Sequence, residues 1–458
     1  MKKILSVLLA LLMMLGSVAA VGAVGSDDFV PVLRFVAASD THVRENEVTN
    51  VERIRKMMAL AYDVADRDPA YRGVDALLIA GDLTNDGTKS EFDTFWNAVS
   101  GSLRDGTRFL GVVAKNHDGY EMKRAELRSY YSSLTGNDAD FHTVVGGYHF
   151  IGVSASSRDI SHYDASQLVW LKKQLDAAVA EDPMKPVFVM HHEPVRGTVY
   201  GSSLYDGWGI TRFSALLRQY PQVVDFAGHS HYPLNDPRSI WQGQFTAVGT
   251  GAIYYSEFTV EGLRAYHPAD SGDTANCWIA ELDRDSNLRL RGYDVNEQKL
   301  LCEEILKNPA NPANRDFTPA NRKKASAPPA FAPGAAPAVE TAFGECRITV
   351  PAAGSRDGMP VVLYRAYAKN SLGATAAKSW VLPCYYRAID QDTVALTLTG
   401  LPDGDYTVGV IAENAYGGQS EPLECSVRVS GDNSFRTFFT RLADWFRTLK
   451  DFFKHLFW

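Results

Sequence analysis

The sequence predicts a layered α/β domain, followed by a small all-β sandwich and a C-terminal amphipathic helix. Within residues 32–307, short apolar runs alternate with amphipathic segments of helical length, which is typical of βαβ units. Residues 341–430 carry short strand-like runs between turn signals, as expected of a sandwich. Residues 434–458 repeat aromatic and aliphatic side chains at helical spacing.

Composition limits the class of protein. The chain has 458 residues, of which 45 % are hydrophobic and 22 % charged, as in folded proteins of two or three domains. Its net charge is −8, and no basic stretch in the body of the chain resembles a nucleic-acid footprint. We therefore expect no specific binding of DNA or RNA.

The first 23 residues predict a signal peptide. Lys2 and Lys3 precede an apolar run, and small residues follow it around 19–23. This predicts a secreted or extracytoplasmic protein; an uncleaved anchor helix is the alternative. The five cysteines show no C-x-x-C spacing, so they signal neither a zinc site nor a redox motif, and pairing between two of them stays open.

The first domain is predicted from its strands and helices in order. Strand-like runs are expected at 32–38, 76–80, 109–114, 148–154, 186–190, 223–227, 245–248, 278–282 and 288–293. Helices are expected at 48–65, 91–103 and 166–179, where apolar residues share one face.

The second half of the chain is predicted in three parts. Residues 308–340 are rich in Pro and Ala and predict a semi-extended linker, with an irregular cover over the first domain as the alternative. Residues 398–422 resemble the second half of a fibronectin type III module, which implies a spacer or binding role for 341–430. The basic, aromatic tail 434–458 suits contact with a membrane surface, although docking on protein or self-association explains it equally well.

Polar residues follow five of the apolar runs. They are Asp40 and His42, Asp82, Asn116 and His117, His191 and His192, and His229 and His231. Taken alone, Asp82 is an ordinary turn residue. Because strand ends meet at one edge of a sheet, the five sets together predict a site of carboxylate, amide and imidazole ligands, which suits Zn, Mn or Fe.

These motifs resemble those of the calcineurin-like metallophosphoesterase family over about residues 33–300. The resemblance rests on Asp40-Thr41-His42, Gly81-Asp82, Asn116-His117-Asp118, His191 and Gly228-His229-Ser230-His231. It implies a sandwich of two sheets flanked by helices, with two divalent or trivalent metal ions at the strand ends. One metal would be held by Asp40, His42, Asp82 and His231, and the other by Asp82, Asn116, His191 and His229. It also implies that His117 acts near the leaving group and that Asp118 orients it.

The predicted function is that of an exported, binuclear-metal phosphoric ester hydrolase, acting on phosphate mono- or diesters by attack of a metal-bound hydroxide. Its substrate would be a phosphate-ester small molecule, a nucleotide or a lipid headgroup. One departure is Lys115, where the family usually has Gly before the Asn-His pair. That departure leaves an alternative: a cell-surface binding or adhesion protein whose phosphoesterase domain is structural or weakly active.

Overall fold

A six-stranded sheet begins at the first residues that the computed structural model describes; these residues are 29–156, 163–203, 208–355 and 358–430. Three of its strands are parallel neighbours: β1 (Pro31–Ala38), β2 (Ala76–Ala80) and β3 (Arg108–Val112). The antiparallel strands β12 (Asn276–Asp283), β13 (Leu288–Asp294) and β14 (Lys299–Leu306) extend it beyond β1. The strand order is β14-β13-β12-β1-β2-β3.

A second six-stranded sheet has the order β4-β5-β6-β7-β9-β8. Its strands are β4 (Phe141–Val145), β5 (Tyr148–Gly152), β6 (Val187–Met190), β7 (Val223–Ala227), β8 (Ile240–Gln242) and β9 (Thr246–Gly249). The central strands β5, β6, β7 and β9 are parallel.

The two sheets pack face to face around an aromatic core. The Phe35 ring of β1 lies 5.3 Å from that of Phe150, 5.0 Å from that of Phe188 and 5.8 Å from that of Phe226, measured between centroids. All four side chains are buried. Truncating such a ring typically costs about 3–5 kcal/mol, so this contact contributes strongly to holding the sheets together.

Helices cover the outer face of each sheet. The helices α2 (Thr49–Asp66), α3 (Lys89–Ser100) and α4 (Arg124–Thr135) bury their apolar faces against the first sheet. The helices α5 (Ala165–Glu181) and α6 (Ser214–Leu217) pack on the second. A capping box, in which Thr88 and Glu91 exchange hydrogen bonds, fixes the start of α3. The predicted layered α/β fold with two sheets flanked by helices is confirmed.

The C-terminal β-sandwich, residues 338–429, consists of two antiparallel sheets around one core. One contains β15 (Ala338–Ala342), β16 (Glu345–Pro351) and β19 (Thr393–Leu398). The other has the order β18-β17-β20-β21 and contains β17 (Val361–Asn370), β18 (Thr375–Val381), β20 (Gly404–Asn414) and β21 (Leu423–Val429). Apolar side chains alternate inward along β19, as the sequence pattern predicts.

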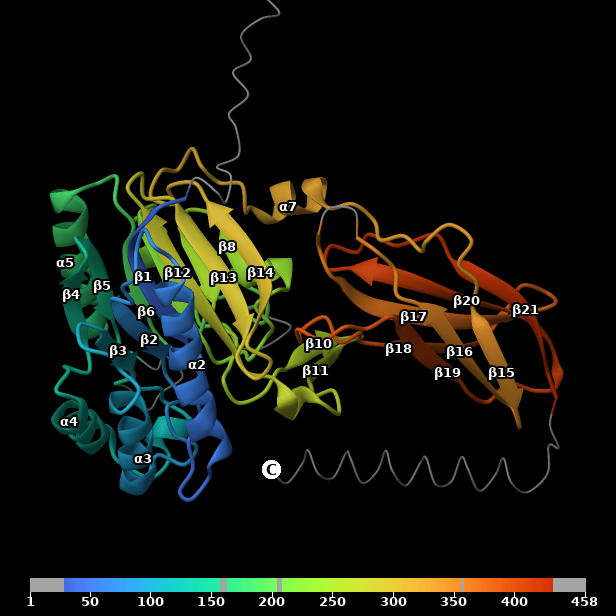
Figure 1. Ribbon diagram of the computed structural model, residues 1–458, viewed down its shortest axis with the longest axis horizontal. Helices are drawn as coiled ribbons and strands as arrows, with labels where there is room; N and C mark the ends of the chain where they lie inside the picture. The colour runs from blue at the N-terminus through green and yellow to red at the C-terminus, as the bar shows by residue number, and fades with distance from the viewer. Residues whose placement is uncertain (1–28, 157–162, 204–207, 356–357, 431–458) are drawn as a thin grey trace, which may run out of the picture.

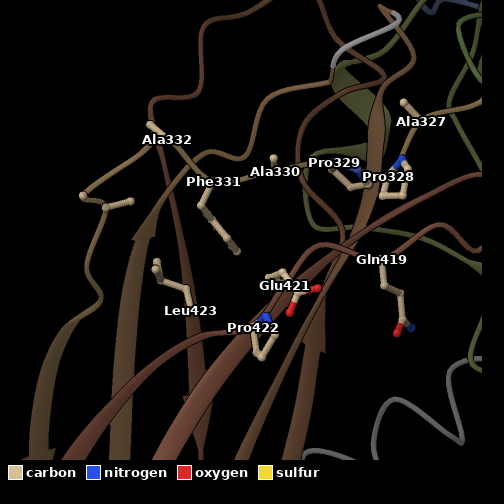
Figure 2. Close-up of a pocket in the computed structure, with 12 residues that line it drawn as sticks. Ala327, Pro328, Pro329, Ala330, Phe331, Ala332, Gln419, Glu421, Pro422 and Leu423 are labelled. Carbon is tan, nitrogen blue, oxygen red and sulfur yellow. The ribbon is translucent and has the colours of Figure 1, made fainter.

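The segment predicted as a linker is packed along much of its length, as in the alternative of a cover. Phe317 is buried in the core of the first domain and exchanges backbone and side-chain hydrogen bonds with Gln242. The helix α7 (Pro319–Ala325) is tied to β14 by the ion pair between Arg322 and Glu304. Residues 327–335 then line a groove against 419–423 of the sandwich (Figure 2). Composition alone missed these contacts because they depend on single anchoring side chains.

A hairpin lies between the two domains (Figure 1). Its strands, β10 (Phe258–Val260) and β11 (Leu263–Tyr266), belong to the chain that connects β9 to β12. The five cysteines are free thiols. The predicted signal peptide and the predicted tail helix 434–458 lie outside the described residues. Among the helices that are described, none is long and apolar enough to cross a bilayer.

Candidate metal centre

The predicted site residues gather where the parallel strands of both sheets end. Asp40 and His42 follow β1, and Asp82 follows β2. Asn116 and His117 come after β3. From the second sheet, His191 and His192 follow β6, and His229 and His231 follow β7.

One group of three ligand atoms comes from Asp40, His42 and His231. The Nε2 atom of His231 lies 3.1 Å from Oδ1 of Asp40 and 3.3 Å from Nε2 of His42. All three side chains are buried. This is the composition expected for a site of a borderline metal ion.

A second group comes from Asp82, His192 and His229. The Nε2 atom of His192 lies 3.1 Å from Oδ2 of Asp82 and 3.1 Å from Nδ1 of His229. Asn116 donates from Nδ2 to the same Asp82 oxygen at 2.8 Å. The two groups are adjacent, because that Asp82 oxygen is also 3.8 Å from Nε2 of His42.

The choice of His191 over His192 as a ligand is corrected by this geometry. His191 lies on the outer side of the second sheet, where its Nε2 is 2.9 Å from Oδ1 of the buried Asp225. The cause is the alternation of side chains along a strand. His191 continues the outward series of Val187 and Val189, whereas His192 continues the inward series of Phe188 and Met190.

Five of the seven predicted ligands adopt a left-handed backbone conformation. The φ angles are 53° at Asp40, 43° at His42, 49° at Asp82, 67° at His229 and 56° at His231. For residues other than glycine this conformation costs about 1–3 kcal/mol each, and such strain concentrates at functional sites. At these five positions the backbone therefore adopts an unfavourable conformation that directs the side chains of the predicted ligands.

Backbone carbonyls fix two of the imidazole rings. Nδ1 of His192 lies 2.8 Å from the carbonyl oxygen of Ala80, and Nδ1 of His231 lies 3.2 Å from that of Tyr255. Because a carbonyl can only accept, each Nδ1 carries the hydrogen and donates it. The lone pair of each neutral ring is then at Nε2, which faces the carboxylates, as metal-binding histidines require.

The buried oxygens of the site test whether metal ions fit. Oδ1 of Asp40, Oδ1 of Asp82 and Oδ1 of Asn116 are buried and accept no hydrogen bond within the protein. Such atoms are costly to bury unless a cation or donor satisfies them. The donor set of carboxylate, amide and imidazole therefore fits metal ions. It fits two, because the groups around Asp40 and Asp82 share no residue; a third group of His42, Asp82 and His117 lies across them.

Burial and the neighbouring charges shift the pKa values of the histidines at the centre. Burial lowers the pKa of His42 to about 4, despite the opposing effect of Asp40. Burial and the neighbouring His192 lower the pKa of His229 to about 4. Burial alone would also lower the pKa of His192, but the carboxylates of Asp82 and Asp40 outweigh it and raise the value well above normal. The carboxylates thus favour positive charge at the centre, either a proton on His192 or bound metal ions that displace this proton.

The loop after β3 places its residues as predicted, with one correction. The ring of His117 is 4.3 Å from that of His42, and its Nδ1 lies 2.8 Å from the carbonyl oxygen of Asn85. Asn85 therefore orients His117, which was the role predicted for Asp118. Asp118 is buried and accepts hydrogen bonds from the backbone of Thr84 and Ala114, so it fixes the loop instead. Burial and the charge of Asp82 raise the pKa of Asp118 to about 7.

Lys115 does not disturb this loop. Its φ is not positive, so the backbone there does not require the glycine that is usual in the family. Asn116 and His117 both reach the centre beside it.

Two residues at the centre, Arg44 and Tyr254, were missed from the sequence. Arg44 donates to the hydroxyl of Tyr254 at 2.9 Å and to Oδ1 of Asn85 at 3.0 Å. The ring of Tyr254 lies 5.1 Å from that of His42, and the ring of Trp208 lies 5.0 Å from that of His229. Arg44 stands two residues after a ligand, which was a usable signal. Tyr254 follows β9, which no ligand motif marks.

Comparison with known proteins agrees with the chemistry of the centre. Residues 33–233 match the model of the calcineurin-like phosphoesterase family, and they form such a domain in this chain. The chain therefore belongs to the class of metal-dependent phosphoric ester hydrolases. A probable glycerophosphodiester phosphodiesterase GpdQ from Arcobacter nitrofigilis is 27% identical over 201 residues, which cover 43% of this chain and 71% of that protein.

Solved structures give weaker likenesses. The protein described as GAP50, the anchor in the inner membrane complex of Plasmodium, matches with a TM-score of 0.42 and 13% identity, over 60% of this chain and 89% of that one. The purple acid phosphatase PPD1 from yellow lupin (Lupinus luteus) matches with a TM-score of 0.41 and 12% identity, over 60% of this chain and 53% of that one.

Proposed function

We propose that the chain is a binuclear metal-dependent phosphodiesterase that hydrolyses phosphodiesters of small polar alcohols. The observation that carries the proposal is the pair of adjacent ligand groups at the strand ends, one on Asp40 and the other on Asp82. The diester is favoured by the relative named as a probable glycerophosphodiester phosphodiesterase.

The ligands are assigned from the distances between their atoms. One ion would be held by Asp40, His42 and His231, and the other by Asn116, His192 and His229, with Asp82 shared. When bound, two such ions place positive charge on the phosphoryl oxygens and make a nucleophile of water near neutral pH. The backbone amide of His229 holds the Asp40 carboxylate. Backbone carbonyls hold the rings of His192 and His231, so these ligands need little reorganisation on loading.

His117 is suited to protonate the leaving alcohol. Its Nδ1 donates to the carbonyl oxygen of Asn85, so the other nitrogen, Nε2, holds the exchangeable proton when the ring is an imidazolium. That proton passes to the departing alkoxide oxygen, which leaves as the alcohol.

Arg44 is suited to bind the anionic ester. Two of its N–H groups are used by Tyr254 and Asn85, and the guanidinium carries five in all. Arg44 and His117 both bond to Asn85, so the remaining donors and the fixed positive charge are on the leaving-group side of the centre, where the non-transferred part of a diester would lie.

Hydrolysis of paired substrates tests the proposal. The full chain, loaded separately with Mn²⁺, Zn²⁺ or Fe³⁺, is assayed on bis(p-nitrophenyl) phosphate, p-nitrophenyl phosphate and glycerophosphoethanolamine. We expect hydrolysis of the diesters with a higher kcat/KM than that of the monoester, and loss of it in Asp82→Asn. The matched control, Asp66→Asn, removes an exposed carboxylate of α2 and should keep the activity.

Two outcomes would contradict the proposal. A metal-loaded protein that is inert on all three esters would favour the adhesion alternative. A clear preference for the monoester would make it a phosphatase. Export and contact of the tail with a membrane surface stay predictions of the sequence.

A further inference from the structure

The chain between β9 and β12 forms one wall of the metal centre; we call residues 252–274 the wall loop. The amides of Ile253 and Tyr254 donate to the carbonyl oxygens of Ser39 and Asp40, each at 3.1 Å. The amide of Glu257 donates to the carbonyl oxygen of His231 at 3.0 Å. The first part of the wall loop is thus bonded directly to the backbone of two predicted ligands.

Side chains and carbonyls of the same part touch the ligand rings. The ring of Tyr254 lies 5.1 Å from that of His42, and the ring of Tyr255 lies 4.2 Å from that of His231. The carbonyl oxygen of Tyr255 also accepts from Nδ1 of His231 at 3.2 Å. A displacement of the wall loop would therefore move a ligand ring and the partner of Arg44.

The far part of the wall loop is held by the C-terminal β-sandwich. The carboxylate of Asp270 accepts from the hydroxyl of Tyr386 at 2.6 Å and from Arg387 at 3.3 Å. The ring of Phe258 packs 4.8 Å from that of Tyr386, and that of Tyr266 packs 5.2 Å from that of Trp380. In Figure 1 the hairpin β10–β11 stands between the two domains, where these contacts are made.

The hairpin adds an apolar contact and an ion pair. Val260 is buried together with Val362 and Leu363 of β17. Arg365 of the same strand pairs with Glu261, the residue after β10. The sandwich thus contacts the wall loop at its hairpin and at Asp270.

One buried arginine joins the two parts of the wall loop. Arg53 of α2 is 5% exposed and donates to the carbonyl oxygen of Tyr254 at 2.6 Å and to that of Gly272 at 2.5 Å. Gly272 is two residues from Asp270. A continuous path of bonded groups therefore runs from Arg387 through Asp270 and Arg53 to Tyr254.

We propose that the C-terminal β-sandwich positions the active-site wall, with Tyr386 and Arg387 as positioning residues that act through Asp270; the inference rests on the proposed phosphodiesterase function. This positioning role of the sandwich takes the place of the spacer role that the fibronectin resemblance implies. Neither residue is itself a ligand, so metal content at saturating metal should stay unchanged, while the ring of His231 is held less firmly. Loss of either residue should release the wall, and a shift of about 1 Å in a positioning element can cost up to 100-fold in rate.

Enzyme kinetics of full-length variants give the first test. We expect Arg387→Ala to lower kcat/KM for bis(p-nitrophenyl) phosphate about tenfold or more, within the range that misplacement can cause. The conservative variant Arg387→Lys should recover part of the loss. Asp270→Ala, which also takes away the acceptor of Tyr386, should lower kcat/KM at least as much, and the double variant should be no worse than Asp270→Ala alone. The matched control is Arg428→Ala, which breaks an exposed ion pair with Asp405 elsewhere on the sandwich.

Amide hydrogen exchange gives a second readout that needs no activity. In Arg387→Ala, the amides of Ile253, Tyr254 and Glu257 should exchange faster than in the wild type, and they should not in Arg428→Ala. An active wild type with unchanged kcat/KM and unchanged exchange in Arg387→Ala would overturn the inference. If the wild type hydrolyses no ester, the proposed function fails, and the exchange of these three amides alone decides the structural claim.

Discussion

The neighbouring histidines after β6 allow a sharp test of the centre, because only one of them faces it. We predict opposite results for His192→Gln and His191→Gln. Removing His192 takes away an Nε2 atom that lies 3.1 Å from both Asp82 and His229. Loss of a residue that only supports a ligand lowers metal affinity by up to about 100-fold. Because His192 is proposed as a ligand itself, metal affinity should fall by more than that.

Removing His191 should act on stability instead. Its Nε2 is 2.9 Å from Oδ1 of Asp225, which is 1% exposed. The two atoms form a close polar contact but not a well-aligned hydrogen bond. Taking the nearest polar group away from a buried carboxylate costs about 1–3 kcal/mol. For a cost of about 2 kcal/mol and a domain of this size, Tm should fall by roughly 4–8 °C.

Metal content per chain and thermal unfolding measure both effects on the same samples. His192→Gln should lose metal, and His191→Gln should keep it while melting earlier. Loss of metal from His191→Gln would refute the assignment, because it would place His191 in the centre.

Three further outcomes follow from the structure. Arg44→Ala should raise KM for a diester by about tenfold through loss of a charged hydrogen bond, with metal content unchanged, and kinetics on bis(p-nitrophenyl) phosphate checks it. An unchanged KM would remove Arg44 from the binding site. Removal of metal by a chelator should lower the free energy of unfolding by about 3 kcal/mol for each bound ion, judged against protein kept in metal at 100 times the dissociation constant. Thermal unfolding under both conditions measures the difference. Glu281→Ala should destabilise the domain by about 3–5 kcal/mol, because it removes a buried carboxylate that pairs with Arg34, Arg289 and Arg291. Denaturant unfolding with no change in metal content would confirm a purely structural role.

Much of the fold was predictable because local patterns and tertiary packing agree. The apolar runs at 76–80 and 223–227 coincide with β2 and β7, since strands buried on both faces read as continuous apolar stretches. The strand β14 was missed, because its burial pattern is mixed and it includes two adjacent glutamates. The packing of residues 308–340 was only the alternative, because its contacts depend on Phe317 and Arg322 reaching the first domain.

The candidate site was predictable where residues stand directly at strand ends. Asp40, His42, Asp82, His229 and His231 all lie at the centre. The choice between His191 and His192 required knowing which face of β6 looks inward, which the alternation Val-Phe-Val-Met does not disclose when every residue is apolar. Tyr254 and the path to Arg387 join distant parts of the chain, so only tertiary structure brings them into view.

Anomalous diffraction from crystals of the full chain loaded with Mn²⁺ is the most direct test of the proposed two-metal centre. We predict two metal peaks about 3.5–4 Å apart, as in two-metal hydrolytic sites, with the Asp82 carboxylate touching both. His192 should contact one of them, and His191 neither. A single peak, or two peaks without Asp82 between them, would contradict the assignment of a two-metal centre that shares Asp82.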